Sequence, residues 1–204
     1  KNRYHLFDTA QDDAVKVQRE SLEAIRYALD HHQFVLYYQP KVNMKIGTVV
    51  GVEALIRWQH PERGLLSPIE FLPVIENHTM MIEIGEWVID TALTQIGQWQ
   101  AMALDLPVST SVNIAAVQLM QPGFIQTLTD LLAAHPNVEP RYLELEMLET
   151  SALEDVNHVS IIMNDCMSLG VHFALDDFGT GYSSLTHLRR LPARLWHCQT
   201  YACL

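Results

Sequence analysis

From Phe34 onward, short runs rich in β-branched and aromatic residues alternate with longer runs whose apolar residues recur at helical spacing. Parallel strands need a crossover of a dozen or more residues between them, and that crossover is usually a helix. The alternation therefore indicates an α/β fold, with βα units around a mostly parallel sheet. The sequence predicts strands at 34–42, 49–58, 109–114, 142–147 and 171–176.

Helices are expected between most of these strands. One begins at Ser67, which can cap it, because Pro68 takes the first helical position and Glu70 can close a capping box. The last helix is ended by Gly170. The other expected helices lie at about 80–102, 122–134 and 152–169. Apolar residues at helical spacing upstream predict a connector helix: Val15, Leu22, Ile25 and Leu29.

Composition excludes several classes of protein. The 204 residues are 49% apolar and 18% charged, which is typical of one folded domain and not of a disordered chain. A formal net charge of -11 argues against binding to a DNA or RNA polymer. The apolar runs are far too short to insert into a membrane. Three cysteines at unrelated spacings form neither a disulfide framework nor a zinc clip, so we expect a protein of the reducing cytoplasm.

Polar side chains gather where the predicted strands end. Glu53, Leu55 and Arg57 share one face of a strand because side chains alternate with period two. In a parallel barrel the carboxyl ends of the strands meet on the functional face. The other strand ends carry oxygen ligands at Asn113, at Glu146 with Glu149 just beyond, and at Asp176 with Asp177.

This set of donors predicts a metal site. Carboxylate and amide oxygens suit Mg²⁺ or Mn²⁺ better than zinc, and two adjacent aspartates suggest two ions that share a ligand. The alternative for any one of these acids is that it caps a helix or pairs on the surface. Agreement across four strand ends favours the metal site.

Five segments occur in an order that resembles the EAL domain family, whose members hydrolyse cyclic di-GMP to linear pGpG. The segments are YYQPKV at 37–42, EALIRW at 53–58, SVN at 111–113, LELE at 143–146 and DDFGTGYSS at 176–184. The resemblance implies a TIM-type (β/α)₈ barrel whose first strand runs antiparallel to the rest. It also implies cyclic di-GMP phosphodiesterase activity with two divalent ions.

The resemblance assigns roles to particular residues. Metal ligands would be Glu53, Asn113, Glu146, Asp176 and Asp177, of which Glu53, Asp176 and Asp177 are the catalytic acids. Gln39, Leu55 and Arg57 would contact the nucleotide. Glu149 would anchor the loop that follows Asp177. Two metal ions can activate water and stabilise the leaving oxygen, so no protein nucleophile is needed.

The family pattern is lost near the end of the chain. Aligned on Leu191 and Pro192, His197 and Gln199 stand where the family has a lysine and an aspartate. The run from Arg194 to Leu204 lacks strand alternation and resembles no part of the family. We therefore expect an incomplete barrel without its last βα units, and poor or absent hydrolysis by this chain.

The resemblance also predicts how the chain is organised. Residues 1–8 resemble the last strand of a GGDEF domain, 9–31 form the connector helix, 32–192 form the EAL-type barrel and 193–204 are a tail outside the family. We expect a homodimer through the EAL domain, and a longer parent protein with GGDEF and sensory domains upstream. Any membrane anchor would belong to those upstream domains.

Two alternative functions stay open. The first is a catalytically impaired EAL module that acts as a cyclic di-GMP receptor or interaction domain. The second is a Mg²⁺-dependent barrel hydrolase that acts on another phosphoester. A protein kinase is excluded, because Asp177-Phe178-Gly179 occurs without the other kinase motifs. The Gly-Thr-Gly loop lacks the ending of a P-loop.

Overall fold

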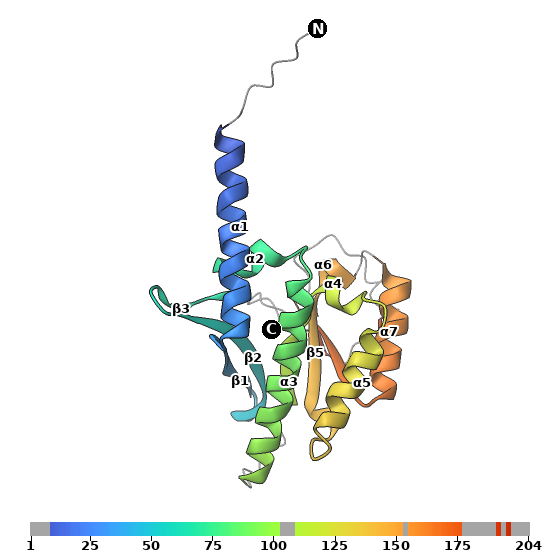
Figure 1. Cartoon of the computed structure of the whole chain (residues 1–204). Coiled ribbons are helices and arrows are strands. Elements are labelled where there is room, and N and C mark those ends of the chain that lie inside the picture. Colours follow the sequence, from blue (N-terminus) through green and yellow to red (C-terminus); the bar gives the residue numbers. More distant parts are fainter. Residues whose placement is uncertain (1–8, 103–108, 153–154, 177–190, 193–194, 197–204) are drawn as a thin grey trace.

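The described strands form a single sheet. The computed structural model describes residues 9–102, 109–152, 155–176, 191–192 and 195–196 (Figure 1). The strand order is β1-β2-β4-β5-β6-β7, with β3 paired to β2. The strands are β1 (Phe34–Asn43), β2 (Thr48–His60), β3 (Gly64–Leu66), β4 (Ser109–Asn113), β5 (Leu143–Leu148), β6 (His172–Asp176) and β7 (Leu195–Trp196).

Strand direction agrees with the prediction. β1 runs antiparallel to β2, whereas β2, β4, β5, β6 and β7 are parallel to one another. The five predicted strands are all present, with ends that differ by no more than two residues. The sequence showed no strand pattern at Leu195 and Trp196, yet the two residues pair with Ala174 and Leu175 of β6. Backbone pairing with an existing edge does not require alternating side chains.

Helices α3, α5 and α7 lie side by side along the sheet, and α1 extends away from it (Figure 1). The longer helices are α1 (Thr9–Asp30), α3 (Met80–Ala101), α5 (Phe124–Ala134) and α7 (Val156–Ser168). The short ones are α2 (Leu72–Ile75), α4 (Ala116–Leu119) and α6 (Glu149–Ala152), with 3₁₀ turns at Pro68–Glu70 and Pro140–Tyr142. No helix in the described residues is long and apolar enough to cross a membrane.

Two predicted helices are divided. The helix expected from Ser67 is one 3₁₀ turn, followed by α2, although the Ser67 N–H donates to Glu70 Oε1 at 3.0 Å as a capping box requires. The helix expected at 152–169 begins at 149 as α6 and continues as α7 after residues 153–154. Elements as short as β3 and α4 were missed, because three or four residues cannot show a periodicity.

The core lies between the outer face of the sheet and the helices. On β2, Ala54, Ile56 and Trp58 are buried. Trp58 joins an aromatic cluster with Phe34 and Phe71, whose ring centroids lie 5.4 to 5.8 Å apart. α3 contributes the predicted apolar stripe, buried at Ile84, Val88, Ala92 and Ile96. Burial of this face leaves the residues at alternate positions of β2 for the other face of the sheet.

Candidate active site at the carboxyl ends of the strands

The parallel register brings the predicted ligands to one edge of the sheet. Asn113, the last residue of β4, is opposite Glu146 of β5. Asp176, the last residue of β6, is opposite Leu148 of β5. Because the strands are parallel and in close register, their carboxyl ends share the same rim.

Glu53 and Asn113 are in direct contact. Asn113 Nδ2 donates to Glu53 Oε1 at 2.9 Å, between the adjacent strands β2 and β4. Glu53 is on the opposite face of β2 from buried Ala54, which turns its carboxylate away from the helices. An amide donor orients a carboxylate, and both side chains carry oxygens that suit a hard cation.

Glu146, on the strand next to Asn113, is buried and has a cationic partner. Its side chain is 2% exposed and pairs with Lys41 Nζ of β1. Lys41 also donates to Ser111 Oγ at 2.6 Å, and Ser111 donates to Glu144 Oε1 at 2.6 Å. A buried carboxylate needs such compensation, since burial disfavours the charged form.

The proposed nucleotide contacts lie on the hairpin of β1 and β2. Gln39 is opposite Glu53, and Leu55 is opposite Tyr37. Arg57 Nη1 donates to the carbonyl oxygen of Ile56 at 2.8 Å, and the Arg57 guanidinium carbon lies 6.0 Å from the centre of the Tyr37 ring. A cation held over an aromatic ring keeps a defined orientation, which suits it to a phosphate.

The remaining predicted ligands are only partly described. Asp176 is half-buried at the end of β6. Asp177 and the loop after it lie outside the described residues, as do the positions of His197 and Gln199. Glu149 is the first residue of α6, but its side chain is not described. Within the described ranges, no three or more His, Cys, Asp and Glu side chains form a group that could hold a metal.

The donors that are described fit a hard divalent cation in their chemistry. Glu53 and Asn113 are held together on neighbouring strands, and Glu146 occupies the next strand in register with Asn113. Glu146 turns one carboxylate oxygen to Lys41. The structure therefore brings two of the predicted ligands into contact and places a third on the adjoining strand.

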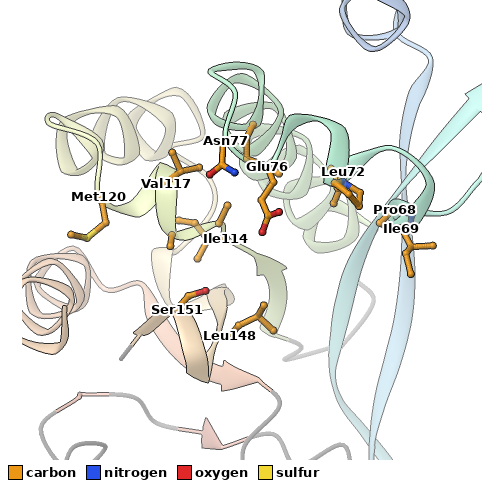
Figure 2. A pocket seen from close by; sticks show the side chains of 14 residues that line it. Pro68, Ile69, Leu72, Glu76, Asn77, Ile114, Val117, Met120, Leu148 and Ser151 are labelled. Atoms are coloured by element: carbon orange, nitrogen blue, oxygen red, sulfur yellow. The ribbon is translucent and has the colours of Figure 1, made fainter. Parts of the chain in front are cut away.

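A pocket of about 670 Å³ opens beside the rim (Figure 2). Its floor includes Ile114, directly after Asn113, and Leu148, two residues after Glu146. The carboxylate of Glu76 points into it from the segment between α2 and α3, as Figure 2 shows. The rest of the lining is mostly apolar, which suits a flat, partly polar group.

Sequence reasoning missed two groups of residues at this site. It gave no role to Lys41, Ser111 and Glu144, although Lys41 follows Gln39 by two positions and Glu144 precedes Glu146 by two, so the period of a strand could have placed them on the same face. It also missed the pocket residues, because Glu76 lies in the turn after α2 and not at the end of a predicted strand.

Comparisons with known proteins agree with one family. A model of the EAL domain matches residues 22–195. The chain is 39% identical over 196 residues to the bifunctional diguanylate cyclase/cyclic di-GMP phosphodiesterase MucR of Pseudomonas aeruginosa, covering 95% of this chain and 28% of that protein. It is 37% identical over 159 residues to the cyclic di-GMP phosphodiesterase PA2567 of the same organism, covering 78% of this chain and 27% of the relative.

Solved structures show the same likeness. The PaMucR phosphodiesterase in its c-di-GMP complex has a TM-score of 0.83 and 40% identity, over 88% of this chain and 72% of that chain. The EAL enzyme Bd1971 in its cGMP-bound form has a TM-score of 0.80 and 33% identity, over 93% of this chain and 51% of that chain.

The chain spans 28% of the length of MucR and 27% of the length of PA2567. The central sheet and its match to EAL structures confirm the predicted α/β fold class, which is TIM-barrel-like with an antiparallel first strand. The family model covers most of the chain, and several relatives exceed 30% identity along it. This chain belongs to the EAL domain family.

Proposed function

We propose that the rim that Glu53 and Asn113 form hydrolyses cyclic di-GMP to linear pGpG, at a rate that the altered end of the chain, with His197 and Gln199, lowers. The observation that carries the proposal is their contact across two parallel strands, at 2.9 Å, in a chain of the EAL family. The named activity of two relatives supports it: MucR and PA2567 are both called cyclic di-GMP phosphodiesterases.

Phosphodiesterases of this family depend on a metal ion. We propose Mg²⁺ or Mn²⁺, with two ions when the site is complete. The chemistry of the donors supports this choice, because hard cations prefer oxygen ligands. A bound divalent pair supplies water activation and charge stabilisation at phosphorus. The residues proposed to hold it are Glu53, Asn113, Glu146, Asp176 and Asp177.

The protein's own residues would bind and orient the dinucleotide. Arg57 is held over Tyr37 and is proposed to contact a phosphate, with Gln39 and Leu55 beside the nucleotide. The pocket next to the rim is proposed to take one guanine. The Glu76 carboxylate can accept hydrogen bonds from N1–H and the N2 amino group of guanine, and the apolar lining can cover the ring.

The test is to incubate the protein with cyclic di-GMP and Mn²⁺ or Mg²⁺ and to separate the products by chromatography. Slow formation of linear pGpG is expected, and it should stop when a chelator removes the metal. If the wild-type protein forms no product but binds cyclic di-GMP in Ca²⁺ by calorimetry, the activity proposed here is wrong and the receptor alternative holds.

One sequence observation favours that receptor alternative. His197 and Gln199 stand where the family pattern has a lysine and an aspartate, and the loss of an aspartate would weaken a second metal site. A protein that binds the dinucleotide without cleaving it would act as a receptor. A third outcome, no affinity for cyclic di-GMP, would point to a hydrolase of another phosphoester.

Three further features stay proposals about the whole protein. We propose a homodimer through the EAL domain, GGDEF and sensory domains upstream, and a cytoplasmic site of action. The name of MucR, a bifunctional cyclase and phosphodiesterase, supports an upstream GGDEF domain. Residues 1–8, which resemble the end of such a domain, lie outside the described residues.

A further inference from the structure

Lys41 extends from β1 to two buried carboxylates on β5. Its Nζ pairs with Oε1 of Glu146 and lies 3.7 Å from Oε1 of Glu144. The Glu146 and Glu144 side chains are 2% and 5% exposed. The two carboxylates therefore share this ammonium as a counter-charge in a place with little access to water.

Ser111 links Lys41 to Glu144 through two hydrogen bonds that run in the same direction. Lys41 donates to Ser111 Oγ, and the Ser111 hydroxyl donates to Glu144 Oε1, each at 2.6 Å. A hydroxyl can accept one bond while it donates another. These two hydrogen bonds require an ammonium donor at one end and a carboxylate acceptor at the other. Lys41 therefore compensates the negative charge of Glu144 both directly and through Ser111.

Gly51 lies beside the lysine stem. Lys41 is opposite Gly51 in the β1–β2 register. A Cβ at Gly51 would lie in ordinary contact with Lys41 Cδ, at 3.6 Å, but only 3.1 Å from the carbonyl oxygen of Ser109 on β4. The lysine stem therefore runs along the face of β2 that also carries Glu53, and the close approach at Gly51 is to β4.

Among the described residues of this cluster, one ammonium faces two carboxylates, and Glu53 lies on the neighbouring strand at the same rim. Carboxylates at the rim attract a cation. Lys41 reduces that attraction, because it occupies one oxygen of Glu146 and repels a second positive charge.

We propose that Lys41 is a positioning residue that acts as a resident counter-cation of the metal site. It holds Glu144 and Glu146 in place when no metal is bound, and it weakens the affinity of the rim for a divalent ion. The inference rests on the proposed metal site that includes Glu146. Replacing a residue that only fills space would not raise the affinity for a divalent ion.

The experiment compares the wild-type protein with Lys41→Met, Lys41→Arg and the control Lys45→Met, which changes an exposed lysine in the turn between β1 and β2. Thermal unfolding is measured in chelator and in Mn²⁺, and Mn²⁺ affinity is measured by calorimetry. In chelator, Lys41→Met should lower the midpoint by about 6 °C or more, because it removes the ammonium that pairs with two buried carboxylates. Lys41→Arg and Lys45→Met should stay close to the wild type.

Mn²⁺ should raise the midpoint of Lys41→Met by more than it raises that of the wild type, with an affinity tighter by roughly threefold to tenfold. If Lys41→Met does not fold in chelator, Lys41→Met with Glu144→Gln should recover part of the stability, because the second change removes one of the two charges.

Three results would overturn the role of Lys41 while leaving the proposed function intact: an unchanged midpoint in chelator, a Mn²⁺ affinity that falls together with stability, or no recovery in the double variant. A wild-type protein that binds no Mn²⁺ would instead refute the metal site itself.

Discussion

At the scale of single residues, the contact between Glu53 and Asn113 makes a direct prediction about activity. Glu53→Gln keeps the volume of the side chain but removes its charge, so metal-dependent hydrolysis of cyclic di-GMP should fall about 100-fold or more. Product chromatography measures the change. Glu62→Gln, in the exposed turn after β2, is the matched control and should keep wild-type activity. Equal rates for Glu53→Gln and the control would remove Glu53 from the site.

A buried thiol on α7 provides a second prediction at this scale. Burial raises the pKa of Cys166 to about 12, and Asp165 adds to the shift. The thiolate is the reactive form, so Cys166 should stay unmodified by iodoacetamide in the native protein at pH 8 and react fully once the protein is unfolded in denaturant. Mass spectrometry of the peptide that contains Cys166 checks this. Rapid labelling of the native protein would contradict it.

At the scale of elements, an ion pair joins α1 to α3. Arg26 Nη1 and Nη2 donate to the two oxygens of Glu83 at 2.5 and 2.6 Å. This bonding lowers the pKa of Glu83 below its ordinary value of 4.5. The pair therefore stabilises the protein fully above pH 4.5 and loses that contribution as pH falls through the lowered pKa.

Glu83→Gln should consequently lower the unfolding midpoint at pH 7 by about 1 to 3 °C, because a half-exposed pair contributes at most about 1 kcal/mol. The difference from the wild type should disappear well below pH 4.5. Calorimetric scans over pH 3 to 7 measure it, with Glu86→Gln on the same helix as the control. A difference that persists at the lowest pH would show that the pair does not act through charge.

The attachment of the segment after β3 depends on Phe71, which is 1% exposed and packs against Phe34 and Trp58. Phe71→Ala should destabilise the protein by about 3–5 kcal/mol, because it leaves a cavity in the aromatic cluster. Ile69→Ala nearby should change stability by less than about 0.5 kcal/mol, since Ile69 is 81% exposed. Urea unfolding of both variants tests this packing, and similar midpoints would contradict it.

At the scale of the whole molecule, cyclic di-GMP should stabilise the fold that binds it. In Ca²⁺ and at 100 times its Kd, the dinucleotide should add about 2.7 kcal/mol, or about 5–10 °C in the unfolding midpoint. Cyclic di-AMP at the same concentration is the control, because adenine lacks the N1–H and N2 amino donors that Glu76 would accept. An equal shift with both nucleotides would exclude guanine recognition in the pocket.

Other domains of a longer protein could reach the candidate site. The site lies at the carboxyl ends of the strands, and helices α3, α5 and α7 cover one face of the sheet (Figure 1). The chain covers 28% of the length of MucR, so regulation of the site by other domains is a proposal for this protein.

Local sequence determined the element pattern and named the candidate ligands. The strand runs and the stripe of α3 could be read from periodicity, because each depends on residues close together in the chain. Glu53, Asn113, Glu146 and Asp176 could be assigned because ligand chemistry and strand ends are both visible in a linear sequence. The division of the predicted helix at 152–169 could not be read, because a short break depends on how the segment packs.

Tertiary structure decided which of these side chains are in contact and which charged groups pair with them. Asn113 reaches Glu53 from 60 positions away, and Lys41 reaches Glu146 from 105 positions away. Such pairs depend on the strand order and register of the sheet, which the periodicity of a sequence does not record. The ion pairs of the candidate site therefore follow from the fold, because charges interact through space, while the list of its proposed ligands follows from the sequence.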